Sequence, residues 1–407
     1  MNKIEELIEK LCPEGVEYKE LGEVCDFQNG FAFKSSLFKE NGYPIIRITN
    51  IQNKNVDELN VVYFNKSDYK ESLSQYEIVA GDILIAMSGA TTGKIGFVSS
   101  NEIFYLNQRV GKFKPYNNIL KNRFLFHFIL TKTVDLYSLA GGGAQPNLSS
   151  VRLMKNIIIP IPSLEIQQEI VNILDKFSEL EAELEAELEA RRKQYEYYRN
   201  QLLTPIEVGG KWFMNGNEVE WKTLGEIGNI CMCKRVMKNE TKPTGDVPFY
   251  KIGTFGKVAD AFISNELYND YKNRFSYPKV GEILLSAAGT IGRTVVYDGE
   301  PAYFQDSNIV WLSNDESKVT NKFLFHYYKI IVWKTDGGTI LRLYNENLAK
   351  TKIPIPSLSE QERIVGILDK FDALVNDISE GLPAEIEARR KQYEYYRNKL
   401  LTFKEKE

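Results

Sequence analysis

The feature that most constrains the fold is a fifteen-residue segment that occurs twice. Residues 190–204 read ARRKQYEYYRNQLLT and residues 388–402 read ARRKQYEYYRNKLLT, with a single difference. A second block, IPIPSLEIQQEIVNILDKF at 159–177, returns as IPIPSLSEQERIVGILDKF at 353–371. Equivalent positions in the two copies are separated by about half of the 407-residue chain. This long repeat period predicts two large units and excludes a solenoid of short repeats.

Both copies are predicted to form long helices. In the first copy, apolar and aromatic residues recur at spacings of three and four between positions 166 and 202, which places them on one stripe of a helix. The residues between them are mostly Glu, Lys, Arg and Gln, which favour helix. With Ser163 as N-cap and Leu203 as the last residue, this helix is about 60 Å long. We expect the second copy, 357–401, to be its partner.

The two copies differ in length by four residues, since the repeat offset rises from 194 to 198 along the chain. Copy one contains a tandem EAEL at 181–188, whereas copy two contains Gly381 and Pro383. Four residues turn a helix by about 400°, so the apolar stripe drifts by only about 40°. Gly381 and Pro383 predict a bend or a brief break, because proline lacks a backbone donor. A charged helix without a partner is the alternative interpretation.

The segments that precede each helix also repeat, but only at a few anchors. VEYKELGEV at 16–24 matches VEWKTLGEI at 219–227, and GDILIAMSGATTGKIG at 81–96 matches GEILLSAAGTIGRT at 281–294. Between the anchors the two segments have no likeness. Short runs of β-branched residues bounded by Gly, Asn or Asp predict strands, and the runs around the repeated FLFH predict helices, so each segment is expected to be an α+β domain with a twisted sheet.

The predicted division of the chain has four parts. They are head 1 with the N-terminal helix at 1–157, a central helical segment at 158–206, head 2 at 207–352 and a C-terminal helical segment at 353–407.

Charge is distributed unevenly along the chain, although its net value is only −4. Residues 27–160 carry 15 basic and 9 acidic side chains, and residues 211–356 carry 19 and 16. Residues 161–210, in contrast, carry 5 basic and 11 acidic side chains. Basic heads and acidic helices are typical of a protein whose heads contact phosphate while its helices do not.

Motifs that would indicate catalysis are weak or missing. GATTGK at 89–94 has three residues between its glycines and Ile95 where a phosphate-binding loop has Ser or Thr, so a turn that carries a basic group to the surface is the better interpretation. His127 and His326 occupy equivalent positions after FLF, which favours two structural histidines over catalytic bases. No catalytic residue is predicted, because the sequence contains neither a nucleophile elbow nor a zinc-protease motif.

The cysteines and the apolar segments restrict the class of protein further. Cys12, Cys25, Cys231 and Cys233 have neither the spacing of a disulfide framework nor that of a zinc site, so they are expected to be structural thiols and no metal site is predicted. No window approaches eighteen consecutive apolar residues, and the start MNKIEELIEKL lacks a signal-peptide pattern. These features predict a cytoplasmic protein without a membrane partner.

Basic, amide and hydroxyl side chains near glycine-rich turns are the candidates for DNA contact, because they can reach phosphates and base edges. Each of them taken alone is also consistent with an ordinary solvated residue. In head 1 the candidates are Lys34, Ser35, Arg47, Asn50, Gln52, Asn53, Lys54, Thr91, Lys94, Gln108 and Arg109. In head 2 they are Lys234, Arg235, Lys251, Thr254, Lys257, Arg274, Arg293, Gln305, Asn308 and Arg342.

Two dissimilar heads, each followed by a near-identical helix, resemble the specificity subunits of Type I restriction-modification systems. The resemblance covers the whole chain and is most specific in the duplicated RRKQYEYYRN runs, the twin IPIPSL junctions, the GDIL and GEIL strands and GFAFKSS in head 1. It implies an α+β protein in which two target recognition domains are separated by two long antiparallel helices that form a coiled-coil spacer with pseudo-twofold symmetry. Each domain would then read one half of a split, asymmetric DNA site.

The resemblance also implies partners and contact residues. Double-stranded DNA, two methyltransferase subunits docked on the helices, and motor-nuclease subunits in the full complex are expected. S-adenosylmethionine, ATP and magnesium would be bound by those subunits and no cofactor by this chain, which would be non-catalytic. The residues expected on the spacer or at subunit contacts are Leu184, Leu188, Arg191, Tyr195, Tyr198, Leu202, Arg389, Tyr393, Tyr396 and Leu400.

Two other classes of function stay open from the sequence. The chain could be a coiled-coil scaffold whose heads bind protein, which predicts no retention of DNA at moderate salt. It could also be an enzyme with an unfamiliar site, which predicts activity from the chain alone. A DNA-reading protein predicts binding that weakens steeply as salt rises.

Overall fold

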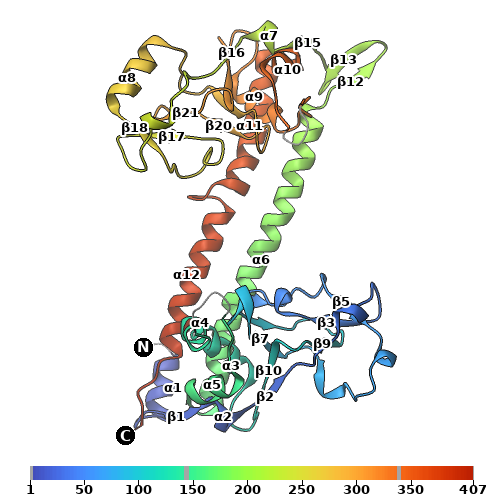
Figure 1. The fold of residues 1–407 in the computed structure, drawn as a ribbon, viewed down its shortest axis with the longest axis vertical. Helices are drawn as coiled ribbons and strands as arrows, with labels where there is room; N and C mark the ends of the chain where they lie inside the picture. The colour runs from blue at the N-terminus through green and yellow to red at the C-terminus, as the bar shows by residue number, and fades with distance from the viewer. Residues whose placement is uncertain (1–2, 142–145, 337–340, 407) are drawn as a thin grey trace. The chain divides into compact units, whose positions relative to one another are not determined.

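The computed structural model describes residues 3–141, 146–336 and 341–406 (Figure 1). It contains two compact units, of which unit 1 comprises Met1–Glu185 with Glu385–Glu407 and unit 2 comprises Ala186–Ala384. Each unit therefore combines one head with helical residues from both copies of the repeat. None of the helices in the described ranges is long and apolar enough to cross a membrane.

Head 1 contains two mixed sheets. The first has five strands in the order β2 (Cys25–Asn29), β10 (Val110–Pro115), β7 (Ile83–Ala86), β8 (Ile95–Phe97) and β4 (Lys54–Asn55). The second has the order β5 (Val62–Phe64), β3 (Tyr43–Ile46), β9 (Phe104–Leu106) and β6 (Glu77–Ile78). The helices of unit 1 besides the repeat are α1 (Lys3–Leu11), α2 (Leu21–Val24), α3 (Asn122–Leu130), α4 (Thr133–Leu139) and α5 (Ser150–Asn156).

Head 2 repeats this plan with different lengths. One sheet has the order β16 (Asn229–Cys231), β22 (Ile309–Ser313), β19 (Ile283–Ser286) and β20 (Thr294–Val296), and another has β18 (Phe262–Ile263), β17 (Val247–Tyr250) and β21 (Tyr303–Phe304). A further three-stranded sheet has the order β12 (Ile206–Val208), β13 (Lys211–Met214) and β14 (Asn217–Glu218). The helices are α7 (Leu224–Ile227), α8 (Asn265–Arg274), α9 (Asn321–Tyr328) and α10 (Asn345–Lys350).

The repeated GDIL and GEIL strands lie between two hydrophobic cores in each head. In β7, Ile83 and Ile85 pack into one core while Leu84 packs into another, as expected when successive side chains point to opposite faces. In β19, Ile283 and Leu285 face one core and Leu284 the other. Burial on both faces explains why these runs are continuously apolar rather than alternating.

The IPIP junctions are extended, because proline fixes its own φ and disfavours helix in the residue before it, and each forms one strand of a two-stranded sheet. β11 (Ile158–Ile161) pairs antiparallel with β1 (Glu17–Glu20), and β23 (Lys352–Ile355) pairs in the same way with β15 (Glu220–Thr223). The repeated VEYK and VEWK anchors are therefore the partners of the repeated IPIP segments.

The helix of the first copy is confirmed as a single element. It is α6 (Leu164–Leu203), which has 40 residues and is the long green helix of Figure 1. Its first turn is capped by Ser163, whose Oγ accepts from the backbone N–H of Ile166 at 3.4 Å.

The bend or brief break predicted for the helix of the second copy is confirmed. The structure has α11 (Leu358–Asn376) and α12 (Leu382–Leu400), separated by a turn at the place where the sequence predicts a break. A Cβ atom on Gly381 would lie 2.5 Å from the carbonyl oxygen of Ala373, so the backbone packs too closely there for any other residue. Pro383 follows as the second residue of α12, where a missing N–H costs nothing.

Within each unit, helices from the two copies lie side by side. In unit 1 the Tyr396 ring of α12 stacks on Phe177 of α6 at 5.4 Å, and Arg390 donates to Glu181 at 2.7 Å. Residue numbers rise on one helix as they fall on the other, so the pair is antiparallel. In unit 2, Tyr198 of α6 stacks on Phe371 of α11 at 5.6 Å. The prediction of an α+β fold with paired long helices is thus confirmed.

Candidate nucleic-acid interface

In each head, several loops gather around a tight turn between two buried strands. We call this group of loops the loop cluster of the head. In head 1 the GATTGK segment makes the turn η5 (Gly89–Thr91) between β7 and β8. Gly89 has φ 78° and its counterpart Gly289 has φ 64°, a left-handed conformation that favours glycine. These two segments are turns between strands, as predicted, and each carries one basic side chain, Lys94 or Arg293.

Two further loops of head 1 contact this turn or the residue before it, and a third loop contacts the end of β9 beside them. The Thr91 hydroxyl donates to the carbonyl oxygen of Ile48 at 3.1 Å, which holds the loop after β3. Arg109, in the loop after β9, donates to the Ser88 hydroxyl at 3.1 Å. The loop that begins at Gly30 joins through a backbone hydrogen bond from Phe31 to Leu106 at 2.8 Å. The structure therefore brings together loops that are far apart in the sequence.

The candidates of head 1 differ in exposure. Lys34, Ser35, Gln52, Asn53, Gln108 and Arg109 are exposed, whereas Arg47, Lys54, Thr91 and Lys94 are half-buried. Asn50 is only 2% exposed. Its side-chain oxygen accepts from the Arg47 N–H at 3.0 Å and its amide donates to the carbonyl oxygens of Asp57 and Asn60 at 3.1 and 2.9 Å. Asn50 thus shapes the loop that presents Gln52 and Asn53.

Lys54 points toward the helices. Its Nζ donates to Glu181 of α6 at 2.7 Å and lies 4.5 Å from the centre of the Tyr393 ring of α12. Burial would raise the pKa of Glu181, but the hydrogen bonds from Lys54 and Arg390 outweigh it and hold the pKa below its usual value. The φ of Lys54 is 75°, a strained value for a residue with a side chain.

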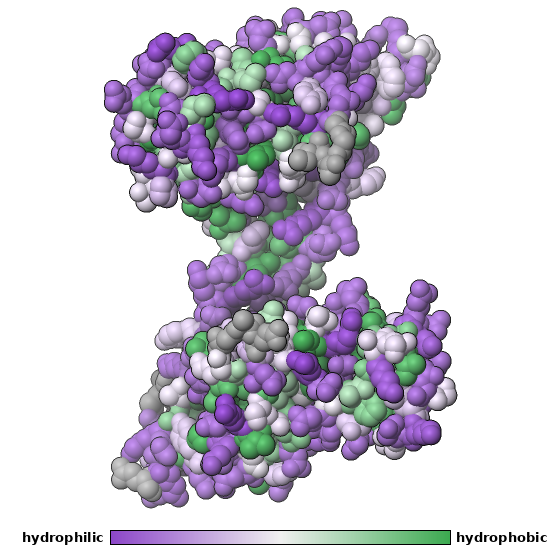
Figure 2. All heavy atoms as spheres, viewed as in Figure 1, coloured by the Kyte–Doolittle hydropathy of each residue, from purple (hydrophilic) through white to green (hydrophobic). Residues whose placement is uncertain are grey.

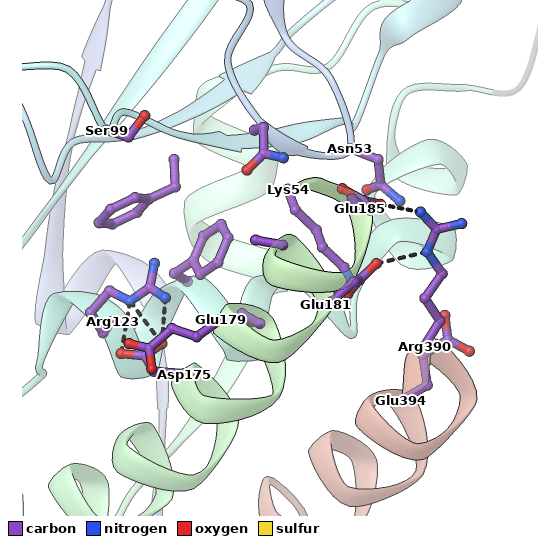
Figure 3. Close-up of a pocket in the computed structure, with 15 residues that line it drawn as sticks. Asn53, Lys54, Ser99, Arg123, Asp175, Glu179, Glu181, Glu185, Arg390 and Glu394 are labelled. Atoms are coloured by element: carbon purple, nitrogen blue, oxygen red, sulfur yellow. Dashed lines mark hydrogen bonds and ion pairs between the residues drawn. The ribbon is translucent and has the colours of Figure 1, made fainter. Parts of the chain in front are cut away.

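A cleft of about 830 Å³ adjoins this ion pair in unit 1 (Figure 3). Its lining includes five carboxylates, Asp175, Glu179, Glu181, Glu185 and Glu394, and three cations, Lys54, Arg123 and Arg390. Arg390 pairs with Glu181 and Glu185, while Arg123 pairs with Asp175. The excess of negative charge makes this cleft unsuited to DNA phosphates, so the loop cluster is the better nucleic-acid surface.

Head 2 gathers its loops in the same manner. The Gln305 side-chain oxygen accepts from the Ile252 N–H at 3.0 Å, and Arg293 donates to the carbonyl oxygen of Phe255 at 2.9 Å. Arg235 pairs with Asp306 at 2.8 Å. Arg342 donates to the Asn308 side chain at 3.2 Å, which joins a fourth segment to the cluster.

Exposure also separates the candidates of head 2. Lys234, Arg235, Lys257 and Arg274 are exposed, and Lys251, Thr254, Arg293, Gln305, Asn308 and Arg342 are half-buried. Lys234 and Arg274 flank the ring of Phe275 at 5.1 and 5.4 Å, an arrangement of cations over an aromatic face that the sequence did not indicate. On the face drawn in Figure 2, hydrophilic side chains cover most of the surface of either unit.

Hydrogen bonds identify equivalent positions in the two clusters. The carbonyl oxygen of Arg109 accepts from Met87 at 2.8 Å, and that of Asn308 accepts from Ala287 at 2.7 Å. Position 109 of head 1 thus corresponds to position 308 of head 2. In the same way, the side chain of Asn50 accepts from the N–H of residue 47 and that of Thr254 accepts from the N–H of residue 251. One backbone frame therefore presents different side chains in the two heads.

The helical candidates also differ in exposure. Tyr195, Tyr393 and Leu400 are buried, Tyr198 is 37% exposed, and Leu184, Leu188, Arg191, Leu202, Arg389 and Tyr396 are half-buried.

Both histidines are fully buried, as predicted, and each is held between the two copies. Nε2 of His127 donates to Asp175 at 2.7 Å, so its Nδ1 accepts from the Tyr393 hydroxyl at 2.9 Å. Burial lowers the pKa of His127, which keeps the ring neutral.

The same arrangement occurs in unit 2 with the copies exchanged. His326 donates to Asp369 at 2.7 Å, and the hydroxyl of Tyr195 lies 3.4 Å from Nδ1 of His326 and donates to Asp372 at 3.0 Å. Head 1 is therefore completed by the tyrosine of copy two, and head 2 by the tyrosine of copy one. The aspartates were missed from the sequence, although their repetition in ILDKF at 173–177 and 367–371 could have indicated them.

The cysteines and acidic side chains show no metal site within the described ranges, where no three His, Cys, Asp or Glu residues are grouped as ligands. All four cysteines are free thiols. Burial raises the pKa of Cys25 and of Cys233 to about 12, which makes both thiols unreactive near neutral pH.

Comparison with known proteins gives a consistent picture. Residues 13–190 and 217–388 match the family described as Type I restriction modification DNA specificity domain. A putative type I restriction enzyme specificity subunit of Haemophilus influenzae is 46% identical, over 95% of this chain and 96% of its own length. A type I restriction enzyme specificity subunit of Escherichia coli is 38% identical over 61% of this chain and 63% of its own length.

A solved structure shares the fold. The crystal structure of the S subunit of a Type-I restriction-modification system from M. genitalium matches with a TM-score of 0.56 and 17% identity, and the match covers 95% of this chain and 96% of that chain.

Proposed function

Because this chain belongs to the family of Type I restriction modification DNA specificity domains, whose members recognise DNA sequence, we propose that its two heads each read one half of a bipartite, asymmetric site. The observation that carries the proposal is the loop frame that occurs twice with different side chains. A protein that recognises one uninterrupted DNA sequence would need only one such loop cluster. Two clusters with unlike side chains fit two half-sites of unlike sequence.

The equivalent positions 109 and 308 illustrate the difference in hydrogen-bonding chemistry. The Arg109 guanidinium offers only donors, which suit the two acceptors of guanine in the major groove. The Asn308 amide offers one donor group and one acceptor, which suit adenine. Exposed cations near the clusters, such as Lys34 and Lys257, would contact phosphates and supply affinity without sequence preference.

The helices are proposed to set the gap between the half-sites and to dock two methyltransferase subunits. α6 is one uninterrupted helix that supplies residues to both units, and its EAEL repeat lies at the point where it leaves unit 1. The acidic character of 161–210 fits a segment that contacts protein rather than phosphate. Motor-nuclease subunits would join the full complex, and S-adenosylmethionine, ATP and magnesium would act in those partners, while this chain supplies recognition and no catalysis.

The test is a map of methylated sites for matched variants of the two heads. The chain is co-expressed with the methyltransferase subunit of its system, and modified adenines or cytosines are located by sequencing. Arg109→Ala is expected to relax one or more positions in one half-site, and Asn308→Ala is expected to relax positions in the other. Each lost bidentate contact corresponds to about 1–3 kcal/mol of discrimination, or roughly 5- to 150-fold.

Glu102→Ala, which changes an exposed residue just before β9, serves as the control and should leave both half-sites unchanged. A relaxation of the same half-site by both variants, or of neither half-site by either, would contradict independent reading by the two heads.

A further inference from the structure

A short hairpin of head 1 carries a lysine at a backbone position that favours glycine. Residues 51 and 56 form an antiparallel bridge, and the N–H of Gln52 donates to the carbonyl oxygen of Asn55 at 2.9 Å, so residues 53 and 54 lie at the tip. We call residues 51–56 the tip hairpin. Lys54 has a φ of 75°, in the left-handed region, where a residue with a side chain is strained.

Head 2 has glycine at the equivalent place. Lys54 lies opposite Gly96 where β4 pairs with β8. Gly96 of β8 and Val295 of β20 are counterparts, because each is paired with the leucine of the repeated GDIL or GEIL strand. A Cβ atom on Gly256 would lie 3.3 Å from the side chain of Val295, and Gly256 has a φ of 70°. Gly256 therefore takes in head 2 the place that Lys54 takes in head 1, with the same backbone conformation.

The Lys54 side chain makes a contact that glycine could not make (Figure 3). Its Nζ donates to Oε2 of Glu181 on α6 at 2.7 Å, and Oε1 of Glu181 accepts from Arg390 of α12 at 2.7 Å. The side chains of Lys54 and Glu181 are 24% and 10% exposed, so solvent and salt screen this ion pair less than a pair on open surface. Through one carboxylate, the tip hairpin is joined to both long helices.

The position on the helix changes together with the position in the hairpin. In the alignment of the two ILDKF repeats, Glu181 of α6 corresponds to Val375 of α11. Val375 is 1% exposed and packs in a hydrophobic core of unit 2. Lys54 and Glu181 of unit 1 are thus replaced by Gly256 and Val375 in unit 2. The lysine and its carboxylate partner occur together in one unit, and both are replaced in the other.

The tip hairpin is also joined to the loop cluster of head 1. The carbonyl oxygen of Ile48, just before the hairpin, accepts from the Thr91 hydroxyl of the turn η5 at 3.1 Å. Asp57, just after the hairpin, donates its N–H to the carbonyl oxygen of the buried Asn50 at 2.7 Å. Because these hydrogen bonds connect the loop on both sides of the hairpin, the position of the hairpin tip affects where the exposed Gln52 lies relative to the turn.

We propose that Lys54 is a positioning residue for DNA reading by head 1, because its ion pair with Glu181 fixes the tip hairpin on the helices. This proposal rests on the proposed function and adds that the reading of one half-site depends on a named contact with α6. Side chains that read base edges must be held within about 0.5 Å of their working geometry, which requires support from neighbouring residues. Gly256 and Val375 give head 2 no such ion pair, so the two half-sites depend on the helices in different ways.

The test compares methylation at preferred sites and at sites with one altered base, for the full chain co-expressed with the methyltransferase subunit of its system. Lys54→Met removes the charge and keeps an unbranched side chain, and Glu181→Gln leaves one acceptor oxygen for two cations. Each variant is expected to lower discrimination roughly 2- to 30-fold in the half-site that Arg109→Ala relaxes. The half-site that Asn308→Ala relaxes should not change.

Two further variants and a second measurement separate positioning from a loss of folding. Lys54→Arg retains a cation at the tip and should keep the original discrimination. Glu179→Gln is the matched control for the helix, since it removes an exposed carboxylate that lines the same cleft, and it should leave both half-sites unchanged. In the purified full chain, hydrogen exchange of residues 50–57 should be faster in Lys54→Met, unchanged in Lys54→Arg, and unchanged in β7 for both variants.

Different failures have different meanings. If Arg109→Ala relaxes its half-site while Lys54→Met and Glu181→Gln do not, the positioning role is overturned and the proposed function stands. The positioning role is also overturned if Lys54→Arg relaxes the half-site as much as Lys54→Met, or if Lys54→Met relaxes both half-sites equally. If the unchanged chain marks no preferred sequence, the proposed function is overturned and the role of Lys54 in reading falls with it, whereas hydrogen exchange still shows whether the ion pair orders the tip hairpin.

Discussion

Removal of one hydroxyl, in Tyr393→Phe, tests whether each head is completed by the helix of the other copy. Tyr393 lies in the second copy of the repeat but contacts His127 of head 1 at 2.9 Å. Both residues are buried, with exposed fractions of 1% and 0%. Since Nε2 of His127 donates to Asp175, Nδ1 is an acceptor that depends on the Tyr393 hydroxyl.

The expected loss of stability follows from the buried acceptor, Nδ1 of His127, that Tyr393→Phe leaves without a hydrogen-bond partner. A buried acceptor that loses its hydrogen bond costs about 1–3 kcal/mol. We take about 1.5 kcal/mol for Tyr393→Phe, which corresponds to a roughly tenfold rise in the population of the opened state. Tyr195→Phe is the matched control in unit 2, because Asp372 keeps hydrogen bonds from Lys329 at 2.7 Å and from Asn376 at 3.0 Å. A smaller cost, about 0.5–1 kcal/mol, is expected there.

Hydrogen exchange measured by mass spectrometry separates the two heads. In Tyr393→Phe the slowest amides of α3 (Asn122–Leu130) should exchange about ten times faster, while those of α9 (Asn321–Tyr328) should not change. In Tyr195→Phe the smaller effect should fall on α9. Faster exchange in α9 for Tyr393→Phe, or unchanged exchange in α3, would refute the exchanged arrangement of the copies.

Two other predictions concern pH and the length of α6. Burial lowers the pKa of His127 and of His326 below the ordinary 6.5, so the stability that depends on the neutral rings is complete above about pH 6.5 and is lost as the pH falls below it. The free energy of unfolding, measured with urea between pH 7.5 and 5.5, should fall with pH by up to about 1.4 kcal/mol per pH unit for each histidine. His127→Gln should remove the part of this pH dependence that comes from head 1, and an unchanged pH dependence in that variant would contradict the reasoning. Insertion of one EAEL after Leu188 lengthens the helix by about 6 Å and should widen the gap between the half-sites by nearly two base pairs without altering either sequence, which methylation mapping would show or refute.

Local patterns in the sequence predict several elements of the fold. The apolar spacing of three and four predicts α6 to within one residue of its observed start, since an amphipathic stripe is a property of neighbouring residues. Gly381 and Pro383 predict the turn between α11 and α12, because their backbones are restricted by chemistry that does not depend on distant contacts. The buried strands β7 and β19 follow from short apolar runs after Gly-Asp and Gly-Glu.

Contacts between distant segments could not be predicted in the same way. The two RRKQYEYYRN runs are identical, so nothing inside them distinguishes the one that rests on head 1 from the one that rests on head 2. Asn50 and Lys54 look like surface residues in the sequence, but Asn50 satisfies three groups of its own loop and Lys54 satisfies the buried Glu181. Such roles are set by which polar groups burial leaves in need of a partner.

The contacts that hold each head on the helices have a consequence for how such proteins acquire new heads. These contacts are made by a histidine from the head, an aspartate from the adjoining helix and a tyrosine from the other copy, and this trio is the same in both units. If a gene segment encodes a foreign head with its own FLFH helix, the aspartate and the tyrosine that its histidine needs are already present on the helices. If each head reads DNA as proposed, recombination can replace one head at a time while the contacts that hold it on the helices are retained.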